Sequence, residues 1–138
     1  MSAAGAALGR VRAVCLALPE AEERPFGDHT APAFRVRDKF FVMTAEDGSS
    51  LTLKAPKGAQ AVLVASDAER FFVPKYVGHI GWVGVRLDLR QPPDWDELAE
   101  LITESYCLVA PRRLAATVAG APIGSEASMP VSGRGRAR

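Results

Sequence analysis

Apolar residues near the N-terminus recur at intervals of three and four positions, a spacing that predicts a helix with one buried face. These positions are Leu8, Val11, Val14, Cys15 and Leu18. Pro19 ends the helix, because a proline disfavours the helical backbone of the residue before it. We therefore expect one amphipathic N-terminal helix that packs on the rest of the domain.

Three stretches that follow have the composition of strands, and the first and third alternate apolar and polar residues as strands with one wet face do. They span residues 33–37, 39–44 and 51–54. Arg37 and Asp38 are the only residues between the first two apolar runs, so we expect a tight hairpin there, although Asn-Gly is the preferred pair. A turn at residues 46–48 precedes the third strand. The pattern predicts three successive strands.

Two further elements follow in the middle of the chain. Pro56 is placed to open a short helix that runs through Ala65, and a short turn follows at residues 66–70. Residues 82–90 carry the clearest strand pattern of the chain, since apolar and charged side chains alternate there. We therefore expect a strand over the whole of 82–90.

The last ordered elements are predicted to be helices. Asp94 follows two prolines and is placed to cap a helix whose first turns are acidic, where the helix dipole favours negative charge. The buried stripe of this helix is Trp95, Leu98, Leu101, Ile102, Tyr106 and Val109. Pro111 breaks it, and residues 112–118 form another short helix. The order of elements predicts an α+β fold, an antiparallel sheet with helices packed mainly on one face.

The chain has 138 residues, with 17 basic and 16 acidic side chains and a formal charge of +1. This length fits one domain, which we place at residues 1–118. Residues 119–138 are rich in glycine, serine and arginine, and we expect a flexible tail with little to bury. The near-neutral charge gives no global attraction to nucleic acid or to an anionic membrane.

No stretch approaches the roughly 20 apolar residues that cross a bilayer, and glycines and arginines interrupt the segment where a signal peptide would lie. Cys15 and Cys107 lack the spacing of a metal or redox motif. We interpret both as packing residues in a reducing compartment. The sequence predicts a cytoplasmic protein that binds no membrane.

Residues 76–84 are the most unusual segment chemically, with three glycines, a histidine and a tryptophan in nine positions. Glycine permits a positive φ or a close approach of the backbone to another group. We predict that Tyr76 and His79 lie at the rim of a pocket while Trp82 anchors the loop in the core. Two alternatives stay open: His79 fixes its own loop through backbone hydrogen bonds, or Tyr76 and Trp82 both stack on a ligand.

Motifs of the common catalytic classes are absent from the sequence. Glycines spaced by three do not match a phosphate-binding or dinucleotide fingerprint, so no nucleotide cofactor is predicted. Asp28, His29 and His79 lack metal-ligand spacing, and the acids between Asp94 and Glu104 are explained by the helix dipole. The sequence therefore predicts no cofactor and no metal, and it favours a binding module over an enzyme that uses His79 as a base.

Several separated motifs stand in a defined order between residues 8 and 116. They are Pro25-Phe26-Gly27-Asp28-His29, Ala33-Phe34-Arg35-Val36, Leu51-Thr52-Leu53-Lys54, Tyr76-Val77-Gly78-His79-Ile80-Gly81-Trp82-Val83, and Trp95-Asp96-Glu97-Leu98 with Ser105-Tyr106 and Ala110-Pro111-Arg112. In this order they resemble the MmcQ/YjbR family. The resemblance implies an α+β fold similar to the CyaY-like or secretion-chaperone-like folds. It also implies DNA binding, because members are described as predicted DNA-binding proteins with a double-wing arrangement.

Two hypotheses about function follow from these residues. The candidate binding residues are Arg35, Arg37, Lys54, Lys75, Tyr76, His79, Trp82 and Arg86. The first hypothesis is a DNA-binding or regulatory module whose strands present the lysines and arginines of this set on one solvent-facing side of the sheet. The alternative explanation of these lysines and arginines is that they only keep an open sheet face soluble. The second hypothesis is a domain that binds a small ligand or a protein at the Tyr76–Trp82 loop.

Overall fold

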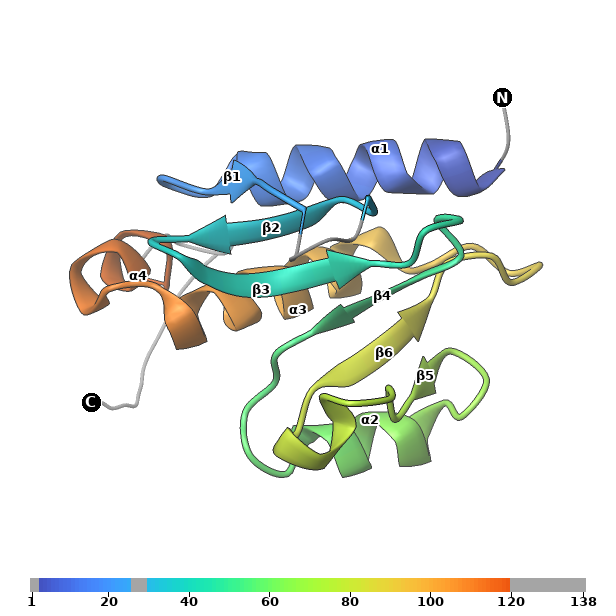
Figure 1. The fold of residues 1–138 in the computed structure, drawn as a ribbon. Coiled ribbons are helices and arrows are strands. Elements are labelled where there is room, and N and C mark those ends of the chain that lie inside the picture. The colour runs from blue at the N-terminus through green and yellow to red at the C-terminus, as the bar shows by residue number, and fades with distance from the viewer. Residues whose placement is uncertain (1–2, 26–29, 120–138) are drawn as a thin grey trace.

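The computed structural model describes residues 3–25 and 30–119. Its centre is an antiparallel sheet in the spatial order β1-β2-β3-β4-β6-β5 (Figure 1). The strands are β1 (Glu22–Glu23), β2 (Ala33–Val36), β3 (Lys39–Thr44), β4 (Ser50–Leu53), β5 (Phe71–Phe72) and β6 (Val83–Arg86). Every neighbouring pair is antiparallel.

The helices gather mainly on one face of this sheet, as the sequence predicts. They are α1 (Ala3–Leu16), α2 (Ala59–Ser66), the short 3-10 helix η1 (Gly78–Ile80), α3 (Trp95–Val109) and α4 (Arg112–Ala119). Helix α3 packs against β2, β3 and β4, and it also contacts α1 and α4. Helix α2 contacts β5, and its residue Leu63 shares a surface groove with Leu101 of α3. The α+β class is therefore confirmed.

The covered face of the sheet carries one row of buried side chains across four strands. Phe34 lies opposite Val42, Val42 opposite Leu53, and Leu53 opposite Val83. All four are fully buried, and Tyr106 of α3 belongs to the same cluster. Because neighbouring residues of a strand point to opposite faces, the residues next to this row point to the open face.

The predicted hairpin between β2 and β3 is confirmed. Arg37 and Asp38 form the turn, with φ values of 51° and 72°. A two-residue turn of type I′ requires a positive φ at both central positions, because its twist then matches that of the strands. Two charged residues occupy a turn that Asn-Gly usually fills, and Asp38 lies 3.5 Å from the guanidinium of Arg35.

The cap predicted for the long helix is also confirmed. The carboxylate of Asp94 accepts hydrogen bonds from the amides of Asp96 and Glu97, at 3.1 and 3.2 Å. These bonds satisfy two of the amides that a helix leaves without a partner in its first turn. Helix α1 begins at Ala3, earlier than its apolar repeat indicates, because alanine favours the helix without needing a buried face.

The predicted strand over 82–90 is wrong beyond Arg86. Strand β4 begins at Ser50, opposite Arg86, so the residues that follow have no strand to pair with. The amide of Leu87 makes the last bond, to the carbonyl of Ser49 at 2.8 Å. The sequence analysis also missed β1 and β5, since two residues cannot show a periodicity.

Two expectations fall outside the described residues. One is the flexible tail, whose residues from 120 onward are not described, and the other is the part of the Pro25–His29 motif at residues 26–29. Along the described ranges, no helix combines the length and apolar character that crossing a membrane needs.

Candidate functional site

Two glycines of the 76–84 segment are needed for different physical reasons. Gly81 follows η1 with a φ of 96°, a backbone region that strongly favours glycine. Gly84 lies in β6 directly against Phe72, and a Cβ at this position would overlap the aromatic ring. The positive φ and the close approach expected from the sequence are therefore both present, at separate positions.

The segment is tied to helix α2 through a glutamine side chain. The Nε2 atom of Gln60 donates to the carbonyls of Gly78 and Trp82, at 2.8 and 2.6 Å. Trp82 is only 8% exposed, which agrees with the anchoring role predicted for it. The sequence analysis did not identify Gln60, although a single polar residue among apolar neighbours in residues 59–64 was a usable signal.

Tyr76 combines an unusual backbone with an exposed ring. Its φ is 69°, and the amide of Val77 donates to the carbonyl of Lys75 at 2.7 Å, which closes a three-residue turn around it. A bulky residue with a positive φ stores strain, on the order of 1–2 kcal/mol. The side chain of Tyr76 is 88% exposed, so no packing in the described chain offsets this strain.

A cavity of about 460 Å³ lies on the open face of the sheet next to this turn. Its floor is a cross-strand row, in which Ala33 lies opposite Met43 and Met43 opposite Thr52. Among the described residues, the lining is Ala31, Pro32, Ala33, Met43, Thr44, Ala45, Glu46, Thr52, Lys75, Tyr76 and Val77. Two predicted site residues, Lys75 and Tyr76, are thus brought to one cavity.

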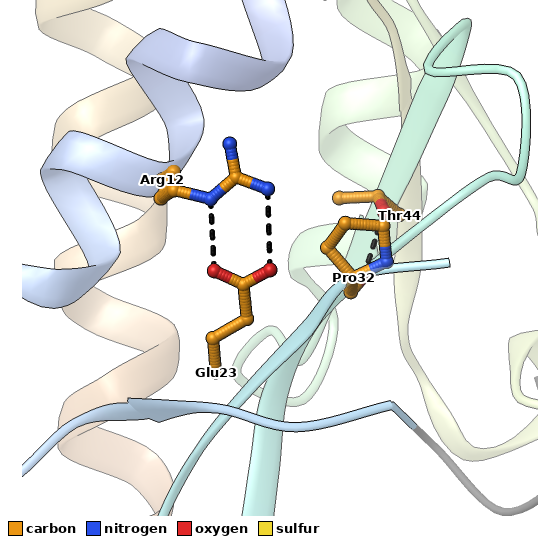
Figure 2. A network of polar contacts seen from close by, with 4 residues as sticks. All are labelled: Arg12, Glu23, Pro32 and Thr44. Carbon is orange, nitrogen blue, oxygen red and sulfur yellow. Dashed lines mark hydrogen bonds and ion pairs between the residues drawn. The ribbon is translucent and has the colours of Figure 1, made fainter. Parts of the chain in front are cut away.

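Most polar groups in the wall are already hydrogen-bonded within the protein. The hydroxyl of Thr44 donates to the carbonyl of Pro32 at 2.6 Å (Figure 2). The carboxylate of Glu46 accepts from the hydroxyl of Thr30 at 2.6 Å and from its amide at 3.3 Å. Lys75 is exposed and has no carboxylate partner among the described residues. The remaining surface of the cavity is mainly apolar.

His79 lies outside this lining. It is exposed in the last turn of η1, next to the exposed side chain of Ile80. The described part of the chain contains no group of three His, Cys, Asp or Glu residues placed to hold a metal ion. The structure therefore separates the two residues that the sequence analysis placed together at a pocket rim.

Acidic residues beside β1 engage the arginines of the predicted basic face. Arg35 pairs with Glu22 at 2.7 Å, and Arg37 pairs with Glu20 at 2.5 Å. The hydrogen bond from Arg37 lowers the pKa of the Glu20 carboxyl below its ordinary value. A third such pair joins Arg12 of α1 to Glu23 through two contacts of 2.8 and 3.2 Å (Figure 2).

The remaining cations do not gather around these arginines. Arg86 donates to the carbonyl of Glu69 at 2.9 Å and covers the ring of Phe72. Arg35 lies on β2 and Arg86 lies on β6, three strand positions away in the sheet. Along the strand direction the two residues also lie near opposite ends. Spacings of about 4.8 Å between strands and about 3.3 Å along them separate their backbones by roughly 20 Å. Lys54 follows β4, and its backbone amide donates to the hydroxyl oxygen of Ser105 at 2.9 Å.

Neither cysteine is placed to act as a nucleophile. Cys15 is fully buried, and this burial raises the pKa of its thiol far above the ordinary value. Burial also raises the pKa of Cys107, whose Sγ lies 3.8 Å from the carbonyl of Ala115. Both thiols are free and stay protonated at neutral pH, so the predicted packing role fits them.

The residues that form the floor of the cavity were not among those predicted from the sequence. Met43 and Thr52 each alternate with buried neighbours in their strands, which places them on the wet face, and Ala33, itself buried, lies opposite Met43. Small and apolar side chains on a wet face are the signal that could have identified them. What the sequence could not give is the cross-strand register that sets them side by side.

Comparisons with known proteins give the family and the fold of the chain. The YjbR family model matches residues 16–108, well over half of the chain. The chain belongs to the YjbR family. This YjbR chain is also similar to the Deinococcus radiodurans protein DR2400, known from a crystal structure with the DUF419 domain. The two share 23% identity over 88% of this chain and 91% of that one, with a TM-score of 0.67, which shows a common fold. No curated protein matches the chain.

Proposed function

We propose that this YjbR-family protein is a binding module for a small molecule, which occupies the cavity beside Tyr76. The observation that carries the proposal is the cavity itself, floored by Ala33, Met43 and Thr52 and closed on one side by the strained turn at Tyr76. Its volume of about 460 Å³ lies within the usual range of small-ligand sites, about 300–1,000 Å³. This corresponds to the second of the two hypotheses from the sequence.

The composition of the lining supports binding rather than catalysis. A ligand site is typically apolar, with a few polar groups that fix the orientation of the ligand. Glu46 is the one carboxylate among the described lining residues, and it is held by Thr30 through two hydrogen bonds. A backbone strained at Tyr76 also fits a site, because such strain concentrates where a side chain is presented to a ligand.

Titration with 1-octanol, followed by the amide resonances of the protein, tests the proposal. We expect saturable shifts confined to the cavity, with Ala33, Met43 and Val77 among the residues affected. Thr52→Phe places a ring on the floor of the cavity and should abolish these shifts. Thr117→Phe adds the same ring to the exposed surface of α4 and should leave them unchanged. Shifts that never saturate, or that persist in Thr52→Phe, would overturn the proposal.

A second candidate function, nucleic-acid binding, is favoured by one observation. Lys75 and Tyr76 are adjacent and both exposed, which sets a cation beside a free aromatic ring. This is the combination with which proteins hold single-stranded nucleic acid. Against it, Arg35 and Arg37 are engaged by Glu22 and Glu20, so a phosphate would have to displace a carboxylate at each.

Fluorescence anisotropy with a labelled single-stranded DNA tests this second function. We expect weak binding that falls steeply with salt, because each neutralised phosphate releases a counterion. The double variant K75A/Y76A should weaken binding more than the triple variant R35A/R37A/R86A, whose arginines already have partners. Nucleic acid is excluded as the ligand if the unchanged protein does not bind the DNA at low salt, or if it and the two variants bind the DNA equally well.

A further inference from the structure

The cavity also carries information about the class of molecule that it holds. We infer that the ligand is a small amphipathic monoanion, an apolar body with a single carboxylate or similar group at one end. This inference rests on the proposed function. It assigns the apolar body to the floor of Ala33, Met43 and Thr52, and the charged end to Lys75.

The apolar body follows from the groups that the lining offers. Alanine, proline, methionine and valine make up most of it, and the hydroxyl of Thr44 is already donated to Pro32 at 2.6 Å. A flat polar body, such as a nucleobase, would leave its donors and acceptors without partners here, at a cost of about 1–3 kcal/mol for each. An apolar body has no such cost and gains from leaving water.

The charged end follows from the one acidic and the one basic residue in the described lining. Glu46 is held by Thr30, while Lys75 has no carboxylate partner among the described residues. A ligand anion at Lys75 therefore supplies the partner that the described residues do not provide. One lysine suits a monoanion, because sites for phosphate usually combine several donors, often with backbone amides at a helix N-terminus. Lys75 is exposed, so the pair contributes selectivity more than affinity.

Three probes with the same apolar chain separate the contribution of the charge from that of the body. They are octanoate, 1-octanol and octylamine, measured by resonance shifts at pH 7. We expect octanoate to bind about threefold to tenfold more tightly than 1-octanol, and octylamine to bind most weakly. Adenosine monophosphate, as a polar dianion, should bind more weakly than octanoate.

Substitutions of single lysines test whether Lys75 causes the preference for octanoate over 1-octanol. Lys75→Ala should remove the preference for octanoate, so that octanoate and 1-octanol bind this variant with equal affinity. Lys39→Ala is the matched control, since Lys39 is also exposed but is not among the residues that line the cavity, and it should keep the full preference.

The outcomes distinguish this inference from the proposed function. Equal binding of octanoate and 1-octanol, a preference for octylamine, or tightest binding of adenosine monophosphate would overturn the monoanion while the cavity remains a binding site. A preference for octanoate that persists in Lys75→Ala would also overturn it. Failure of all the probes to give saturable shifts would overturn the proposed function as well.

Discussion

Tyr76 has a strained backbone conformation that its own packing does not offset. Its positive φ is unfavourable for a tyrosine, and its ring is almost fully exposed, so its side chain contributes little packing in return. Gln60 and Trp82 fix the segment that follows, which leaves the turn itself as the strained part. A residue of this kind is explained more readily by a role in binding than by stability.

Tyr76→Gly should therefore stabilise the protein and impair binding at the same time. Relief of the left-handed strain, less the greater chain entropy of glycine, should raise the free energy of unfolding by about 0.5–1 kcal/mol. Urea denaturation measures this change, and the 1-octanol titration should show weaker binding. Tyr76→Phe keeps the backbone strain and serves as the control, with unchanged stability. A loss of stability in Tyr76→Gly would contradict the assignment of strain.

Trp82 and His79 should respond to truncation in opposite ways. Trp82→Ala removes a buried ring and should lower the free energy of unfolding by about 3–5 kcal/mol. His79→Ala removes an exposed side chain and should change it by less than about 0.5 kcal/mol. Denaturant titration of both variants measures the difference. If His79→Ala unfolds the protein, the histidine is structural and its place among the candidate binding residues is lost.

The helices and strands of this fold begin and end where the local sequence predicts when their contacts are with residues nearby in the chain. The hairpin of β2 and β3 forms with a two-residue turn, and α3 begins at the carboxylate that caps it. Strand β6 differs, because its length depends on β4, which lies about thirty residues earlier in the chain. The apolar alternation continues through Leu89, yet pairing stops at Arg86, where the partner strand ends.

The turn of the hairpin gives a prediction at the scale of an element. Asp38→Gly replaces a residue with a φ of 72° by the residue that type I′ turns favour at this position. The free energy of unfolding should rise by about 0.5–1 kcal/mol, even though the contact of Asp38 with Arg35 is lost, because that carboxylate is exposed. Lys39→Gly, one residue into the strand, should lower it instead. Equal effects of both changes would contradict the turn assignment.

Considered as a whole molecule, the protein divides its helices and its candidate site between the two faces of one sheet. Helix α3 covers the face that carries Phe34, Val42, Leu53 and Val83, and this burial supplies most of the core. The opposite face carries the cavity, whose floor is the row formed by Ala33, Met43 and Thr52. Stability and candidate function therefore rest on opposite sides of the same strands.

Removal of residues 120–138 tests whether the domain ends where the sequence predicts. The truncated protein should keep its thermal midpoint, because the removed residues offer too few apolar side chains to offset the entropy of ordering them. Differential scanning calorimetry of both forms measures the midpoint. A drop of many degrees on truncation would show that the tail is part of the folded unit.

The sequence by itself determined the features that depend on neighbouring residues. Periodicity and caps gave the helices, the hairpin and the α+β class, and separated motifs gave the family. The tertiary structure alone decided which cations find acidic partners, since Glu20 and Glu22 reach Arg37 and Arg35 only once β1 has joined the sheet. It also decided the cavity, because the register across β2, β3 and β4 sets its floor residues side by side. Local patterns report on contacts a few residues apart, whereas ion pairs and cavities depend on distances between segments that the chain brings together only in folding.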